Sequence, residues 1–537
     1  MNRTLVIYDT TLRDGGQSEG ISYTAEDKIK IAKKLDQFGV DYIEGGWPGS
    51  NPKDIRFFEK ANDLEWKNAK IAAFGSTRRA NCTVSEDKNI GLLLKAKTPA
   101  IAIFGKSWDL HVTEGLRTTL EKNLEMIYDS IAYLKEKNKT VIYDAEHYFD
   151  GHKANPQYAL ETLNVAVEAG ADCLVLCDTN GGTIPKQLEA IIEHTRAQNI
   201  SASYGIHAHN DSDVAVANSL QAIQQGFDHV QGTINGYGER CGNANLCSVI
   251  ANAALKLKIP TSKNLDLKEL TRVSRYISEI ANIPQRDELP FVGNSAFAHK
   301  GGIHVSAIRR NPKTYEHIDP ALIGNHQRIL ISDQSGRSNV VFKAEKMGLD
   351  IKGDNDNVKK IVDHLKELEH YGYQYEAADG SFEVLARKAT GEFHPFFELQ
   401  GAKVIIEKRE ESSAYSEAIC KVRVDGVVEH TAADGHGPVD ALDKALRKAL
   451  EPFYPSLKQL YLVDYKVRVL DSSAATASKV RVLIESADND SIWGTVGVSE
   501  NIIQASWQAL VDSIRYKLLK EMKKIAKKGG TKSKPVR

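Results

Sequence analysis

Short apolar runs alternate with longer amphipathic segments along the first half of the chain, and this alternation constrains the fold more than any other feature. The runs are rich in β-branched residues and have the length of buried strands. The segments between them have helical spacing, and the segment at 25–35 has Thr24 in place to cap its first turn. Strands that alternate with helices predict a parallel sheet. The runs lie at 5–8, 42–44, 71–74, 101–104, 141–143, 173–176, 204–206 and 229–233.

Eight strand–helix units are the number that closes a (β/α)8 barrel, so we predict an α/β barrel domain over residues 1–270. A doubly wound open sheet is the alternative, but it does not need an eighth strand. A barrel places its chemistry where the strands end and the following loops begin. Polar residues should therefore gather at those positions.

Charged and polar residues do follow most of the runs, as the barrel prediction requires. Their side chains would meet at one end of an otherwise apolar barrel. They are Arg13 and Asp14 after the first run, Glu44 in the second, Asp144 and Glu146 after the fifth, Asp178, Thr179 and Asn180 after the sixth, His207 and His209 after the seventh, and the loop 236–243 after the eighth.

Two histidines stand two positions apart at the end of the seventh run. Side chains at positions i and i+2 of a strand share a face, so His207 and His209 can reach one ion. A carboxylate such as Asp14 would complete a three-ligand face on a divalent metal and leave positions for a chelating substrate and water. A bare His-x-His pair also fits two unrelated histidines, and the strand-end position is what favours the metal site.

Composition narrows the class of partner. With 537 residues, the chain is long enough for two or three domains. Lys and Arg number 70 against 71 Asp and Glu, so charge gives no case for binding nucleic acid or a membrane surface. The chain opens on a strand-like run without a cleavable apolar segment, and it has no apolar stretch of about 18 residues. We therefore expect a cytoplasmic protein that acts on small molecules.

Four sequence blocks, in this order, carry a family resemblance. They read DTTLRDG at 9–15, HAHND at 207–211, GYGERCGNAN at 236–245 and HKGGIH at 299–304. Together they resemble the 2-isopropylmalate, homocitrate and citramalate synthase family, which are barrel enzymes that condense acetyl-CoA with a 2-oxo acid. The segment 143–151 differs from isopropylmalate synthases and resembles the citramalate branch, which uses pyruvate.

The resemblance implies a divalent metal, Mg, Mn or Zn, held by Asp14, His207 and His209 with Asn243 nearby or bound through water. These residue types alone do not choose among the three metals. Arg13 is expected to contact the bound 2-oxo acid and to stabilise the negative charge that develops on oxygen as the carbon–carbon bond forms. A surface arginine paired with a neighbouring carboxylate is the alternative for Arg13.

The same resemblance implies which residues move protons. Glu146 and His304 match the glutamate and histidine associated with deprotonation of acetyl-CoA, and Glu146 would orient the His304 ring. Tyr315 resembles the tyrosine that helps to activate the hydrolytic water. These roles require His304 to reach the barrel mouth, either within one chain or from a partner subunit.

The substrate site is expected at the ends of the fourth to sixth runs. Thr179 resembles the residue that contacts the carboxylate of the 2-oxo acid, and Asp144 lies beside it at the end of the fifth run. Pyruvate carries only a methyl group, so a bulky side chain should close its pocket. Phe104 and Tyr143 are the candidates for that wall, although one or two methylene groups separate substrates by only about 1–3 kcal/mol.

The remainder of the chain divides into three parts. Helical spacing around a turn-rich stretch at 332–339 predicts linker subdomains over 271–390 that carry His304. From 391 to 523, strands followed by a helix occur twice, which predicts an α+β domain with an internal β-α repeat. It resembles the regulatory domain of the same family, which binds an end-product amino acid at a dimer interface, and a purely structural dimerisation domain is the alternative. Residues 524–537 predict a basic, solvated tail.

The resemblance therefore implies a homodimeric acyltransferase that makes (R)-citramalate and CoA from acetyl-CoA, pyruvate and water, with isoleucine as its feedback inhibitor. A 2-isopropylmalate or homocitrate synthase would use a larger 2-oxo acid. An acyl-CoA lyase would not need the C-terminal repeat. A non-catalytic amino-acid sensor would have no reason to keep the metal and base residues together.

Overall fold

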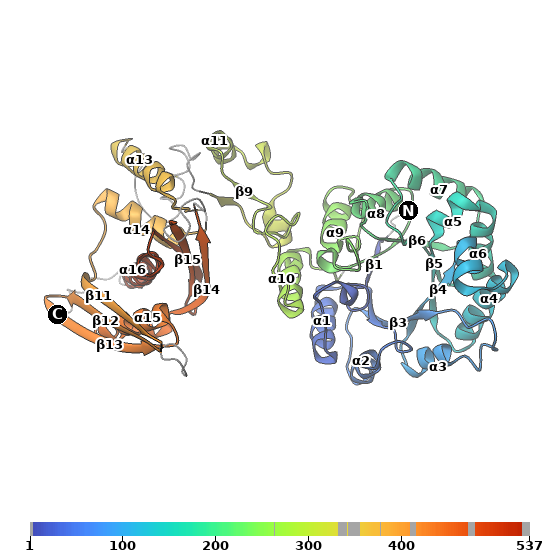
Figure 1. Cartoon of the computed structure of the whole chain (residues 1–537). Coiled ribbons are helices and arrows are strands. Elements are labelled where there is room, and N and C mark those ends of the chain that lie inside the picture. The colour runs from blue at the N-terminus through green and yellow to red at the C-terminus, as the bar shows by residue number, and fades with distance from the viewer. Residues whose placement is uncertain are drawn as a thin grey trace. The chain divides into compact units, whose positions relative to one another are not determined.

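The computed structural model describes residues 4–262, 264–330, 341, 355–375, 377–408, 415–470 and 478–528 (Figure 1). They form two compact units. The first unit comprises Met1–Phe297 and Ile318–Gln327, and the second comprises Ala298–His317 and Arg328–Arg537. The turn-rich stretch predicted at 332–339 lies outside the described residues.

Eight parallel strands close into a barrel in the first unit, which confirms the predicted (β/α)8 fold. Strand β1 pairs with β8 from Val6 opposite His229 to Asp9 opposite Gly232, and this pairing closes the ring. The strands are β1 (Val6–Asp9), β2 (Tyr42–Gly46), β3 (Lys70–Ser76), β4 (Ala100–Lys106), β5 (Thr140–Glu146), β6 (Cys173–Asp178), β7 (Ser203–Ala208) and β8 (His229–Gly232).

Helices surround the barrel, and local sequence signals set their ends. Helix α1 begins with a capping box in which the Thr24 hydroxyl accepts a hydrogen bond from the backbone N–H of Asp27 at 3.1 Å. It ends at Gly39, whose left-handed backbone lies so close to the Asn264 carbonyl that a Cβ would collide with it. The helices are α1 (Ala25–Phe38), α2 (Pro52–Asn62), α3 (Lys88–Lys95), α4 (Leu120–Glu136), α5 (Tyr148–Ala154), α6 (Pro156–Glu168), α7 (Pro185–Ala197), α8 (Ala215–Gln224), α9 (Leu246–Leu255) and α10 (Leu270–Ala281).

Side chains along β5 alternate between the barrel interior and the helices outside. Val141, Tyr143 and Ala145 join the apolar cluster shared with the helices, whereas Ile142 packs inside the barrel. The expectation that Tyr143 helps to close the substrate pocket is therefore wrong. Because side chains alternate along a strand, Tyr143 and the cavity-lining Asp144 face opposite sides of the barrel wall.

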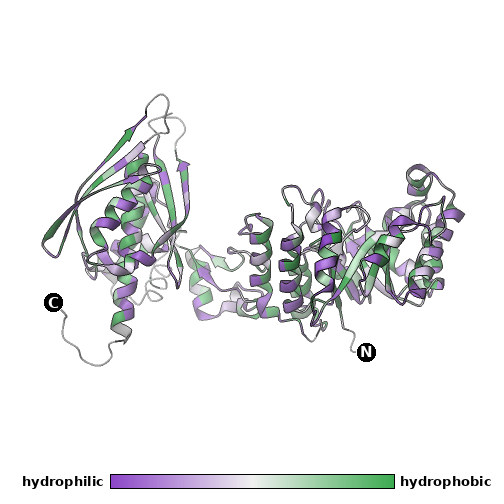
Figure 2. Cartoon of the chain, turned by 90° about the horizontal axis from the view of Figure 1, so that it is seen from below, coloured by the Kyte–Doolittle hydropathy of each residue, from purple (hydrophilic) through white to green (hydrophobic). Residues whose placement is uncertain are grey.

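The second unit contains two three-stranded antiparallel sheets, and a helix follows each sheet. This arrangement confirms the predicted α+β domain with its β-α repeat. Apolar side chains of both sheets and both helices share one core. Figure 2 shows apolar and polar positions alternating along these strands. The elements are β11 (Glu398–Glu407), β12 (Tyr415–Val424), β13 (Val427–Gly435) and α15 (Pro438–Leu450), then β14 (Tyr461–Val469), β15 (Val480–Ala487), β16 (Ile492–Ser499) and α16 (Ile502–Lys528).

Among the described residues of the second unit, three further helices precede the sheets, namely α11 (Gly302–Arg310), α13 (Asn355–Tyr371) and α14 (Asp379–Thr390). A short β9–β10 pair joins Ala298–His299 to Arg328–Ile329. At the other end, α16 continues to Lys528, so the first part of the predicted tail is helical. Buried Lys517 donates to Asp488 at 2.7 Å, and Lys524 forms an ion pair with Asp490, so the β15–β16 turn supports the helix. Residues 529–537 lie outside the described residues. Every helix in the described ranges is too short or too polar to span a lipid bilayer.

Candidate active site

A cavity of about 390 Å³ opens where the barrel strands end. It lies at the end of the barrel that the sequence pattern indicated. The predicted barrel residues that line it are Arg13, Asp14, Phe104, Asp144, Glu146, Thr179, His207 and His209.

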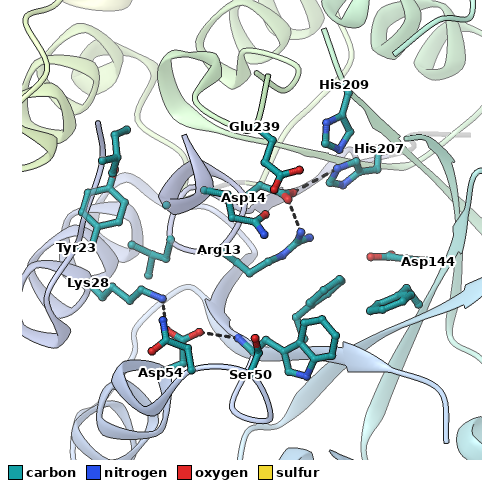
Figure 3. A pocket seen from close by; sticks show the side chains of 18 of the residues that line it. Arg13, Asp14, Tyr23, Lys28, Ser50, Asp54, Asp144, His207, His209 and Glu239 are labelled. Atoms are coloured by element: carbon teal, nitrogen blue, oxygen red, sulfur yellow. Dashed lines mark hydrogen bonds and ion pairs between the residues drawn. The ribbon is translucent and has the colours of Figure 1, made fainter. Parts of the chain in front are cut away.

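Asp14, His207 and His209 form a buried group of potential metal ligands beside this cavity (Figure 3). One ligand atom from each residue lies within 4.8 Å of the others. Asp14 follows β1 and the histidines lie at the end of β7, so the closed barrel brings together side chains far apart in sequence. His207 Nε2 lies 3.3 Å from Asp14 Oδ2.

Asn243 completes the group from the loop after β8. Its Nδ2 lies 3.1 Å from His207 Nε2 and 3.3 Å from Asp14 Oδ2. Its Oδ1 is buried and has no hydrogen-bond partner among the described residues, so a donor oxygen is left unsatisfied beside the ligands. A Cβ at Gly238 would collide with this oxygen, so the loop needs glycine there. One carboxylate, two imidazoles and a free amide oxygen fit a divalent cation.

Burial and neighbouring charges favour the metal-binding forms of these side chains. Burial and the neighbouring His207 lower the pKa of His209 to about 3, so its ring is neutral at pH 7. Burial alone would raise the pKa of Asp14, but Arg13 and the two histidines lower it below its usual value. Neutral imidazole and ionised carboxylate are the forms that bind metals.

The Arg13 guanidinium is held between two carboxylates. It forms an ion pair with Asp14, and its Nε lies 2.5 Å from Glu44 Oε1. The other Glu44 oxygen accepts a hydrogen bond from the Tyr8 hydroxyl at 2.8 Å. The guanidinium carbon lies 3.7 Å from the centre of the Phe74 ring. These contacts place a positive charge at a defined point of the barrel mouth.

Three aromatic rings form one wall of the cavity. The rings of Phe104 and Phe74 stack with centroids 5.3 Å apart, and Trp47 meets Phe104 edge-on at 5.5 Å. All three residues line the cavity, but the sequence analysis found only Phe104. The runs at 71–74 and 101–104 both end in phenylalanine, and this shared position could have indicated Phe74.

Glu146 and Thr179 are held by neighbours that sequence reasoning missed. Glu146 forms an ion pair with Lys106, the residue opposite it in the β4–β5 pairing. The Thr179 hydroxyl accepts a hydrogen bond from the His147 backbone N–H at 2.9 Å. Lys106 and Glu146 have opposite charges and lie at the ends of consecutive predicted strands. This pattern could have indicated their ion pair from the sequence.

Asp144 lies deeper in the barrel, where Figure 3 shows its carboxyl group facing the cavity. Burial and then the nearby Glu44 raise its pKa well above the usual value. Its Oδ1 accepts a hydrogen bond from Gln231 at 3.0 Å, and Gln231 also contacts His207. Sequence analysis did not identify Gln231, because it lies inside a strand rather than after one.

His304 and Tyr315 belong to the second unit. The structure brings these two predicted residues together, with ring centroids 4.2 Å apart in a stacked arrangement. His304 is exposed on α11, and Tyr315 is also exposed. His299 of the same sequence block contacts Glu316 at 3.1 Å.

Three family models match successive parts of the chain. Residues 4–277 match a family model described as HMGL-like. Residues 291–372 match a homocitrate synthase post-HMGL domain-like model, and residues 376–518 match the LeuA allosteric (dimerisation) domain.

Several curated proteins are similar along nearly the whole chain. The (R)-citramalate synthase of Aquifex aeolicus is 55% identical over 522 residues, which cover 97% of this chain and 99% of that protein. The (R)-citramalate synthase of Geobacter sulfurreducens is 56% identical over 515 residues, which cover 96% of this chain and 97% of that protein. A probable 2-isopropylmalate synthase of Methanopyrus kandleri is 31% identical over 508 residues, which cover 95% of this chain and 97% of that protein.

Proposed function

The chain belongs to the (R)-citramalate synthase family, and from this premise we propose that its barrel mouth condenses acetyl-CoA with pyruvate and water to give (R)-citramalate and CoA. The observation that carries the proposal is the buried group of Asp14, His207 and His209 beside Arg13 in the cavity. A divalent metal held there, with Asn243 as a further ligand, would act as a Lewis acid on the ketone of pyruvate.

Arg13 stabilises the charge that develops as the bond forms. The methyl carbon of acetyl-CoA attacks the ketone carbon of pyruvate, and the ketone oxygen gains negative charge. A guanidinium already oriented by Glu44 and Asp14 can donate to that oxygen without further rearrangement. Arg13 therefore acts mainly on the transition state rather than on substrate binding.

The aromatic wall sets the preference for a small 2-oxo acid. In the proposed complex, the carboxylate of pyruvate contacts Thr179, and Asp144 lies beside the bound acid. The methyl group of pyruvate faces the rings of Phe104 and Phe74. A branched side chain would need the space that these rings occupy. Pyruvate is therefore preferred over the acid that 2-isopropylmalate synthases use.

His304 and Glu146 supply the proton transfers. His304, from the same chain or from a partner subunit, would remove a methyl proton from acetyl-CoA, and Glu146, held by Lys106, would orient the imidazole and raise its basicity. After condensation, water adds to the thioester carbonyl and the CoA thiol leaves. Tyr315, stacked on His304, assists in activating that water.

The C-terminal domain provides dimerisation and regulation by isoleucine. Support comes from its match to the LeuA allosteric (dimerisation) model and from the exposed apolar side chains of β14, where Tyr461, Leu462 and Val463 are all exposed. The three matched regions also support the division into a catalytic barrel to residue 270, a linker to 390 and a regulatory domain to 523.

CoA release tests the reaction and the substrate in one experiment. Purified protein is supplied with acetyl-CoA, Mg or Mn and one of pyruvate, 2-oxobutanoate, 2-oxoisovalerate or 2-oxoglutarate. We expect the highest kcat/KM with pyruvate and weaker turnover of 2-oxobutanoate. Preference for a larger acid would overturn the substrate assignment, and no release with any acid would overturn the reaction.

A further inference from the structure

The side chain of Gln231 crosses the barrel interior and joins two residues of the cavity. From β8 its Oε1 contacts His207 Nδ1 at 2.7 Å, and its Nε2 donates to Asp144 Oδ1 at 3.0 Å. Gln231 stands opposite His207 in the β7–β8 pairing, whereas β5, which carries Asp144, pairs only with β4 and β6. All three side chains are buried.

The two hydrogen bonds of this amide assign the proton on His207. An amide has one accepting and one donating end. In the orientation that the structure gives this amide, its nitrogen donates to Asp144 and its oxygen accepts from His207, so Nδ1 carries the ring proton. The lone pair of the ring is then on Nε2, the atom that faces Asp14 at 3.3 Å and Asn243 at 3.1 Å. This is the tautomer that binds a metal through Nε2.

We propose that Gln231 is a positioning residue, which holds His207 in its metal-binding tautomer and connects that ligand to Asp144. The inference rests on the proposed function, because it takes His207 as a metal ligand. His207 and Asp144, the two residues that Gln231 connects, both line the cavity. Gln231 is not among the described residues that line it. The connection therefore passes behind the bound substrates, and the Gln231 side chain acts without touching them.

A purely structural role for Gln231 would give a different result from the proposed one. A buried amide that only fills space and satisfies its neighbours would change stability when replaced, but it would leave the metal affinity of the folded protein unchanged. Loss of an outer hydrogen bond to a ligating histidine typically weakens metal binding by about 10–100-fold. Metal affinity, measured apart from activity, therefore separates the two roles.

The test is calorimetric titration of the metal-free, full-length protein with Mn²⁺. Q231M removes both hydrogen bonds with little change in volume, and we expect it to weaken Mn²⁺ binding by about 10–100-fold. Q221M is the matched control, because Gln221 lies on α8 and donates to Glu189 at 3.0 Å. It should bind Mn²⁺ as the wild type does.

A second pair of variants distinguishes the two ends of the amide. Q231E keeps an acceptor for His207, so Mn²⁺ affinity should stay within about threefold of wild type, but it turns a carboxylate toward Asp144 and should raise the KM for pyruvate. Adding D144N to Q231E supplies an amide donor to that carboxylate and should lower the KM again. This pair also carries the test if Q231M does not fold.

Either of two results would overturn the inference. One is a folded Q231M that binds Mn²⁺ as tightly as wild type, and the other is a Q231E that weakens binding as much as Q231M does. In both results the wild type binds Mn²⁺ and the proposed function survives. A wild-type protein that does not bind Mn²⁺ would remove the proposed metal site and this inference with it.

Discussion

The barrel mouth buries polar side chains, whereas the C-terminal sheets leave apolar side chains exposed. At the mouth, Asp14, Glu44 and His207 are buried, and each has a charged or hydrogen-bonding partner from another strand or loop. On β14, by contrast, Tyr461 and Val463 are exposed.

The difference shows what each region requires. Buried charges are tolerated only when they are paired, so the mouth must be arranged before substrate arrives. An exposed apolar strand gains stability when another surface covers it. Changes at the mouth should therefore alter chemistry without altering assembly, and changes on the C-terminal sheets should do the reverse.

The largest effect is expected from D14A. Loss of this carboxylate removes a proposed metal ligand and one partner of Arg13, so we expect kcat to fall by about 10³-fold or more. Gel filtration should show the same oligomeric state as wild type. Activity above about a tenth of wild type would show that Asp14 is not needed in the site.

R13K should lower kcat by about 10²–10³-fold, which is a smaller fall than we expect for D14A. Lysine keeps the charge but cannot bridge Glu44 and Asp14 through a planar fork. The KM for pyruvate should change far less than kcat, and steady-state kinetics measure both. A rise in KM with unchanged kcat would assign Arg13 to binding instead.

V463D should separate assembly from chemistry. Val463 is 46% exposed on β14, and a charge there should raise the dimer dissociation constant by about 10–100-fold in analytical ultracentrifugation. Ile184 on the barrel is 49% exposed, so I184D is the matched control and should leave the constant unchanged. Equal effects of both variants would mean that β14 has no special part in dimerisation.

The pH dependence of barrel stability should reflect His229. Burial and the nearby His207 lower the pKa of His229 to about 3, whereas an unfolded histidine titrates near 6.5. The unfolded chain therefore binds the extra proton first, so stability is present above about pH 6.5 and is lost as the pH falls toward 3. From pH 7 to 5 the wild type should lose about 2 kcal/mol more than H229F in chemical denaturation. Equal losses of stability in the wild type and in H229F would contradict this role of His229.

The smallest effect is expected from isoleucine. A ligand of the native C-terminal domain at about 100 times its Kd adds about 2.7 kcal/mol, which raises Tm by several degrees. Calorimetry with isoleucine should show this shift, and leucine at equal concentration serves as the control. No shift and no inhibition would leave the domain a purely structural dimerisation element.

Sequence alone predicted the features that depend on local pattern. Strand-end placement identified Asp14, His207 and Phe104, because each follows or ends an apolar run. It could not identify Lys106 or Gln231, whose partners are set by pairing and by contacts across the barrel.

Two errors have the same origin in missing three-dimensional context. Both faces of a barrel strand are buried, so hydropathy does not reveal which residues face inward, and Tyr143 was placed on the wrong side. The continuation of α16 depends on Lys517 and Lys524 finding partners in a distant turn, which the charge run alone did not show.

The alternation along β5 has a consequence for how such an enzyme changes over time. Asp144 lines the cavity while its neighbour Tyr143 supports the fold from the other side of the same wall. Replacements on the inner face can therefore adjust which acid is accepted, and replacements on the outer face can adjust how much heat the barrel withstands. The two properties are free to drift separately along a single strand.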